Sequence, residues 1–69
     1  MPDPALAPIR VLAYSSDAEA WSVTLDGAPV SSGTAASAED AAATAALVAV
    51  SCVLALRIVG LAARVEPTT

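Results

Sequence analysis

Cys52 is the only thiol of this 69-residue chain and its softest potential nucleophile. A cysteine attacks as the thiolate, which forms at neutral pH when a histidine or another cation lies beside it. The chain has no histidine, and the neighbours of Cys52 along the sequence and one helical turn away are mostly apolar, including Val48, Val53 and Leu56. We therefore expect Cys52 to be a core thiol and not a reactive one.

Hydroxyl groups and carboxylates are the other groups that could act in catalysis. Ser15, Ser16, Ser31 and Ser32 lack a base to activate them, because the chain has neither histidine nor lysine. The acidic pairs, Asp17 with Glu19 and Glu39 with Asp40, fall in a predicted loop and at a predicted helix start, where acids are common. The single Asp-Gly and Ser-Gly steps are turn sequences and not a phosphate-binding loop. The sequence thus predicts no enzyme, no metal site and no cofactor.

Size and charge restrict the class of protein. A chain of this length fits one domain that buries little surface, so disulfides, a metal or a partner often stabilise such domains. Because the chain has one cysteine and no histidine, we expect association with another protein chain to stabilise the domain. The net charge of −4, with no lysine and three arginines, makes direct nucleic-acid binding unexpected. An acidic protein of this kind could instead bind a basic protein partner.

The N-terminal half predicts a three-stranded antiparallel meander. Residues 1–8, with three prolines, are expected to form a flexible arm without a secretory signal. Alternating apolar residues predict strands at about 9–15, 20–25 and 28–34. Asp26-Gly27 predicts a two-residue hairpin turn that pairs Leu25 with Ala28, Val23 with Val30 and Trp21 with Ser32.

Two residues refine this picture of the third strand. Pro29 cannot donate to a neighbouring strand and places the third strand at an edge of the sheet. Gly33 could allow a bulge or a close approach of the backbone.

Trp21, in the second predicted strand, is expected to be the core anchor on the helix side of the sheet. On the open face of the sheet it would be a binding hot spot instead.

The C-terminal half predicts one long helix at about 38–64, followed by a short tail at 67–69. Ser37 is the expected N-cap, accepting from the Asp40 backbone N–H. The predicted fold is therefore α+β, a βββα order within a single domain over 9–66. Because residues 47–60 are rich in β-branched side chains, a βββαβ order with a fourth strand at 52–59 is the alternative.

Apolar residues line two faces of this predicted helix, whereas packing on one sheet requires a single face. One stripe is Ala45, Val48, Cys52, Leu56, Val59 and Ala63. The other stripe, the predicted interface, is Leu47, Val50, Leu54, Ile58, Leu61 and Val65. A rod of about 27 residues would span roughly 40 Å, against about 23 Å for a seven-residue strand. The predicted helix should therefore overhang the sheet, and we expect a second copy to cover the excess.

Three hypotheses of function follow. The first is a small cytoplasmic interaction or structural module, of phage or bacterial origin, that forms homo-oligomers through this helix. The second is a single-pass membrane protein spanning at about 41–63, with its arginine-bearing end in the cytoplasm. The third rests on a resemblance. Residues 9–50, with Gly33, Thr34 and an acidic helix start, resemble the strand–strand–helix core of HicB-type antitoxins.

That resemblance implies an acidic regulator that binds a basic partner protein. The sequence departs from the family pattern, since the spacing is longer and the proline-containing hairpin motif is absent. The resemblance therefore assigns no role to any residue of this chain.

Overall fold

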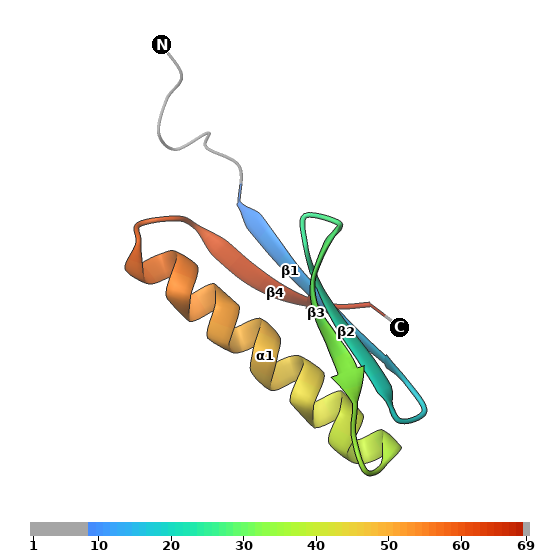
Figure 1. Ribbon diagram of the computed structural model, residues 1–69. Coiled ribbons are helices and arrows are strands. Elements are labelled where there is room, and N and C mark those ends of the chain that lie inside the picture. The colour runs from blue at the N-terminus through green and yellow to red at the C-terminus, as the bar shows by residue number, and fades with distance from the viewer. Residues whose placement is uncertain (1–8, 69) are drawn as a thin grey trace.

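The computed structural model describes residues 9–68 and contains four strands and one helix (Figure 1). In chain order these are β1 (Arg10–Asp17), β2 (Ala20–Leu25), β3 (Ala28–Thr34), α1 (Ala38–Ile58) and β4 (Ala63–Pro67). The strands predicted at 20–25 and 28–34 have these bounds, and the first strand runs two residues past its predicted end. The predicted N-terminal arm lies outside the described residues.

The four strands form one sheet in the order β3-β2-β1-β4. The pairs β1–β2 and β2–β3 are antiparallel, whereas β4 lies parallel to β1. Helix α1 lies along one face of this sheet and connects β3 at one edge to β4 at the other (Figure 1). The fold is thus a two-layer α+β arrangement whose opposite sheet face carries no other element of the described residues.

The element order is the βββαβ alternative, and the fourth strand lies in a different place from the one predicted. Residues 52–59 belong almost entirely to α1, and the strand follows at 63–67. The predicted helix at 38–64 was too long, because α1 ends at Ile58. The predicted tail was also placed too early: Pro67 closes β4, and Thr68 donates its backbone N–H to the Tyr14 carbonyl oxygen at 2.8 Å.

Gly60 explains why the helix stops. Its φ of +89° is in the left-handed region that favours glycine. The Gly60 N–H donates to the Arg57 carbonyl at 3.0 Å, and the Leu61 N–H donates to the Leu56 carbonyl at 2.9 Å. This pair of bonds is a Schellman motif with glycine at its left-handed position. The Arg57 guanidinium also donates to the Ala63 carbonyl at 3.0 Å and holds the start of β4 against the helix end.

The start of α1 agrees with the sequence prediction. Ser37 has an extended backbone, and its hydroxyl oxygen accepts from the Asp40 N–H at 3.1 Å. Glu39 and Asp40 lie in the first turn, where the positive end of the helix dipole favours carboxylates.

The β2–β3 hairpin has the predicted turn and a different register beyond it. Leu25 pairs with Ala28 as predicted, but a bulge between Val23 and Thr24 shifts the register, so Val23 pairs with Ser31 and Trp21 with Gly33. The predicted pairs Val23–Val30 and Trp21–Ser32 were therefore wrong. The extra residue of the bulge falls at Val30, which leaves the strand ladder.

The core lies between α1 and the middle of the sheet. Leu12 and Val23 are its largest fully buried side chains. From the helix the fully or nearly buried residues follow a four-residue repeat: Ala41, Ala45, Ala49 and Val53. Because alanine is small, the helix backbone lies close to the strands, and little apolar area of α1 is needed to fill the gap.

Candidate interaction surface

The outer face of α1 is an exposed apolar surface. Leu47 is 67% exposed, Val50 45%, Leu54 54% and Ile58 84%. These four residues follow each other at steps of three and four, the spacing that places side chains on one side of a helix. We call them the outer stripe. Exposed large apolar side chains that follow each other in this way are typical of interaction sites.

The alanine repeat determines which residues project outward. Ala41, Ala45 and Ala49 face the sheet, so the residues half a turn away must face solvent. Four residues of the other sequence stripe therefore meet the sheet: Ala45 is buried, and Val48, Cys52 and Leu56 are partly buried against the core. The stripe's last two members lie beyond α1, where Val59 is exposed and Ala63 is buried within β4. Periodicity alone could not choose between the two faces, because both are apolar.

Two residues of the predicted interface do not lie on the outer stripe. Leu61 completes the Schellman motif at the start of the connection to β4, where its side chain is exposed. Val65 lies in β4 opposite Leu12 and packs against the core. The stripe reaches both residues only if the helical repeat continues past Gly60, whereas α1 ends at Ile58.

Trp21 lies on the helix side of the sheet, where it is partly buried against the core. It shares this side with Val23 and Leu25, which alternate with it along β2. Its indole covers Gly33 so closely that a Cβ at that position would lie 3.1 Å from the ring. Gly33 therefore provides the close backbone approach that the sequence suggested. Because Trp21 is partly exposed, it lies at the edge of the core, and Leu12 and Val23 lie at its centre.

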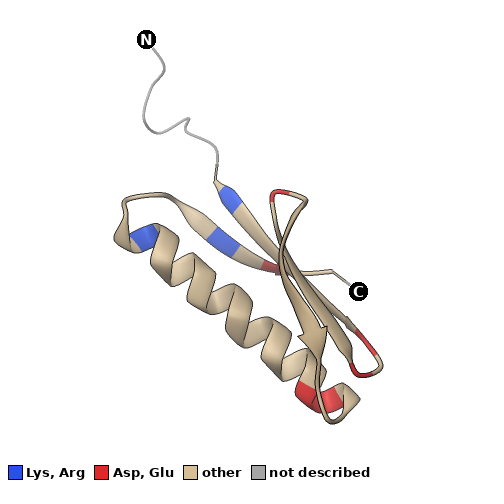
Figure 2. Ribbon diagram, viewed as in Figure 1, with Lys and Arg blue, Asp and Glu red and all other residues tan. Residues whose placement is uncertain are grey.

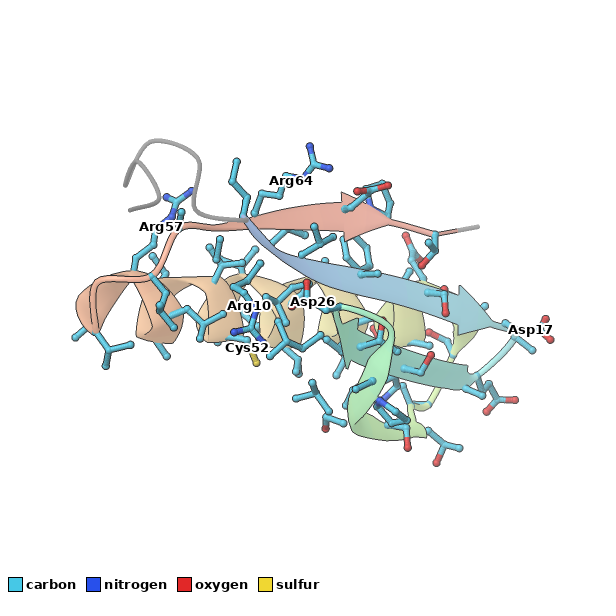
Figure 3. All side chains as sticks on the ribbon, turned by 90° about the horizontal axis from the view of Figure 1, so that it is seen from above. Arg10, Asp17, Asp26, Cys52, Arg57 and Arg64 are labelled. Atoms are coloured by element: carbon cyan, nitrogen blue, oxygen red, sulfur yellow. The ribbon has the colours of Figure 1, made fainter. Side chains whose placement is uncertain are left out.

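Four acids lie at one end of the molecule, whereas the three arginines lie toward the other end together with Asp26 and Glu66 (Figure 2). The first turn of α1 and the β1–β2 turn carry acids: Asp17, Glu19, Glu39 and Asp40. The other end carries Arg57 near the end of α1, with Arg10 and Arg64 at the starts of β1 and β4. Figure 3 likewise separates Asp17 from the three arginines along the length of the molecule.

Two of the three arginines pair with carboxylates of their own chain. Arg10 forms an ion pair with Asp26, and Arg64 lies 3.4 Å from Glu66. Among residues 9–68, Arg57 forms no such ion pair, and its described bond is the one to the Ala63 carbonyl.

Asp26 connects the β2–β3 turn to the start of β1 (Figure 3). Its carboxylate accepts from the Val11 N–H at 2.9 Å and from the Arg10 guanidinium. The Val11 N–H, and after it the bond from Arg10, lower the pKa of Asp26 below its ordinary value. The Asp26 N–H in turn donates to the Val11 carbonyl at 2.9 Å. These bonds hold the β2–β3 turn against the start of β1.

An apolar groove of about 380 Å³ lies between α1 and the sheet. Its lining consists of Leu12, Leu25, Val30, Cys52, Ala55, Leu56 and Val59. Sequence reasoning missed this groove, because its walls come from four elements and depend on the bulge that turns Val30 aside. Cys52 lines the groove and is partly buried, in the apolar setting that the sequence predicted.

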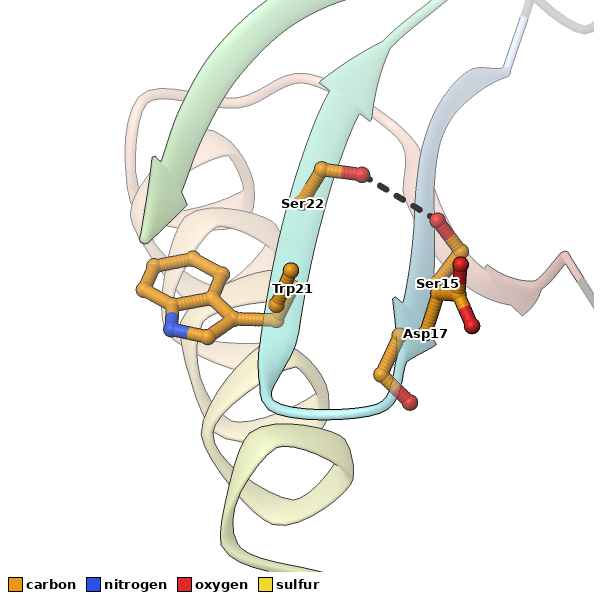
Figure 4. A pocket seen from close by; sticks show the side chains of 6 residues that line it. Ser15, Asp17, Trp21 and Ser22 are labelled. Atoms are coloured by element: carbon orange, nitrogen blue, oxygen red, sulfur yellow. Dashed lines mark hydrogen bonds between the residues drawn. The ribbon is translucent and has the colours of Figure 1, made fainter. Parts of the chain in front are cut away.

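A second hollow, of about 250 Å³, lies at the β1–β2 hairpin and includes Ser15, Asp17 and Ser22 (Figure 4). The Ser15 and Ser22 hydroxyls lie 3.1 Å apart across the strands. The Trp21 indole points away from this pair (Figure 4). Neither hydroxyl has a histidine to activate it, since the chain contains none.

By length and composition, α1 is one helix that could cross a membrane. A core helix of a soluble protein meets the same criterion, so the criterion does not assign a membrane span. In comparisons with known proteins, no protein-family model, no curated protein and no solved structure matches this chain.

Proposed function

We propose that this chain is a non-enzymatic protein–protein interaction or structural module that self-associates through the outer stripe of α1. The observation that carries the proposal is the exposure of Leu47, Val50, Leu54 and Ile58 on a helix whose opposite side already packs on the sheet. Burying such side chains contributes about 1.5–3 kcal/mol each when burial is complete. A second copy offers the same stripe, as two-fold symmetric dimers require.

The position of β4 favours this proposal over a membrane span. β4 pairs with β1 in the same sheet as β2 and β3. A transmembrane α1 would hold its two flanking strands on opposite sides of about 30 Å of hydrocarbon. The sheet would have to come apart, and the alanine face would lose its contacts with the strands.

The third hypothesis is a basic protein partner. The acidic end of the molecule supports it less specifically than the outer stripe supports self-association. Its four carboxylates have routine places in a helix first turn and at a hairpin. The outer stripe, by contrast, has no structural role within the described fold. We therefore place self-association first.

Leu54→Glu tests the proposal, because Leu54 lies within the outer stripe and is more than half exposed. The charge should convert the assembly to a monomer while the fold persists, as measured by light scattering after size-exclusion chromatography without detergent and by circular dichroism. Ala42→Glu is the matched control, since Ala42 is exposed on α1 outside the stripe. A wild-type monomer, or an assembly that survives Leu54→Glu, would contradict the proposal. Partition of the wild type into membranes would favour the membrane hypothesis instead.

A further inference from the structure

Glu39 and Arg57 flank the outer stripe on the same side, one at each end of α1. Their positions differ by 57 − 39 = 18 residues, which is five complete turns at 3.6 residues per turn. The two side chains therefore leave the helix in the same direction, about 27 Å apart along its axis. Both residues are exposed.

Neither charge is neutralised within the described part of the chain. The ion pairs there join Arg10 to Asp26 and Arg64 to Glu66. Arg57 keeps donors available besides its bond to the Ala63 carbonyl. Each copy thus carries one anion and one cation on the same edge of its apolar stripe.

We propose that α1 packs antiparallel against α1 of a second copy about a two-fold axis, with Glu39 of each copy beside Arg57 of the other. This inference rests on the proposed self-association. A two-fold axis perpendicular to the helices, in the plane between them, reverses the direction of the helix and preserves its left and right edges. It therefore brings Glu39 of one copy to the same edge and the same level as Arg57 of the other, twice in each dimer.

The apolar residues match this arrangement. With Glu39 opposite Arg57, the axis crosses α1 at residue 48, so Leu47 and Val50 of both copies lie around it. Leu54 then lies close to the level of Ala43 of the other copy, which is on the same side of α1 as the outer stripe. A large side chain faces a small one on each side of the axis, as close packing of two helices requires.

A parallel arrangement lacks these advantages. It would bring together the acidic ends of two copies, with Asp17, Glu19, Glu39 and Asp40 of each. It would also align the two helix dipoles, whose like ends repel. Charge complementarity across an interface fixes orientation in this way.

Charge exchange tests the pairing. Glu39→Arg and Arg57→Glu should each raise the dimer dissociation constant about tenfold, because each places like charges side by side twice. The double variant should restore the wild-type value within about threefold. The dissociation constants are measured by sedimentation equilibrium, and circular dichroism checks the fold. Since the double variant also lacks the bond from Arg57 to Ala63, its recovery would report the ion pair and not that bond.

Glu19→Arg is the matched control, with the same charge change at the same end of the molecule but in the β1–β2 turn. It should leave the dissociation constant unchanged within about twofold. A double variant no tighter than the single ones would overturn the Glu39–Arg57 pairing, even if the protein is a dimer.

Disulfide trapping tests the orientation independently. In a Cys52→Ser background, a mixture of Ala43→Cys and Leu54→Cys variants should form a mixed disulfide on oxidation. Two copies of position 43 would lie about 15 Å apart along the helix axis, beyond the reach of a disulfide. A disulfide between two Ala43→Cys copies would overturn the antiparallel arrangement and leave self-association intact. A wild-type monomer in the sedimentation experiment would contradict the proposed function itself.

Discussion

At the scale of single residues, Asp26 shows how a local turn signal acquires a long-range role. The Asp-Gly step predicts the hairpin, and both residues have positive φ values in the structure, 50° and 89°. The carboxylate, however, also accepts from Val11 and Arg10 at the start of β1. The sequence could not predict this contact, because it depends on how β1 pairs with β2.

The lowered pKa of Asp26 predicts a loss of stability in acid. In the folded state Asp26 holds its proton less readily than in the unfolded chain, so its contribution is present above the unfolded value, near pH 4, and disappears as the pH falls through the folded pKa. Asp26→Asn should therefore reduce the free energy of unfolding at pH 6 and flatten its dependence on pH below about 4.

The measurement is urea unfolding between pH 2 and 6, followed by Trp21 fluorescence. Both proteins carry Leu54→Glu, so that self-association does not contribute to the difference. Asp17→Asn makes the same chemical change at an exposed strand end and serves as the comparison. Equal slopes for the reference and Asp26→Asn would show that the bonds from Val11 and Arg10 do not favour the charged carboxylate.

At the scale of elements, the alanine repeat of α1 makes the contact with the sheet. Ala45 is fully buried, and a larger side chain there would push the helix away from the strands. Ala45→Leu should lower the free energy of unfolding by about 1–3 kcal/mol through overpacking.

Ala42→Leu introduces the same side chain at an exposed position of the same helix, where the change should be within about 0.5 kcal/mol. Urea unfolding of both variants at one protein concentration provides the measurement. An Ala45→Leu protein as stable as the Ala42→Leu protein would mean that the helix does not lie close to the sheet.

The end of α1 shows where sequence reasoning at this scale failed. The apolar repeat continues through Gly60, and the predicted helix followed it to residue 64. A left-handed glycine after Ile58 is a typical helix end, and this local signal was outweighed by the periodicity. The predicted overhang of the helix was too large for the same reason, since residues 63–67 turn back as β4. The surplus of apolar surface comes instead from the second face of α1.

At the scale of the whole molecule, the meander and the helix start could be predicted because turns, caps and alternation are local. The position of β4 could not, because its partner β1 lies more than fifty residues earlier in the chain. The candidate surface was predicted in part: four of its six residues lie on the outer stripe. The other two predicted residues, Leu61 and Val65, lie elsewhere because the helix ends before them.

Self-association should couple the stability of the whole molecule to its concentration. Because the folded dimer alone buries the outer stripe, mass action should raise the melting temperature by several degrees over a hundredfold increase in protein concentration. Differential scanning calorimetry provides the measurement, and the Leu54→Glu protein should melt at one temperature throughout. A wild-type melting temperature that does not change with concentration would argue against a dimer that dissociates on unfolding.

The parallel pairing of β1 with β4 has a consequence for synthesis on the ribosome. The two hairpins and α1 consist of neighbouring residues and can form as the chain emerges, but β4 is translated after all of them. Until it arrives, β1 presents an unpaired edge that another nascent strand could occupy. Synthesis of β4 thus determines whether the growing polypeptide completes its own sheet or pairs with a strand of a neighbouring chain.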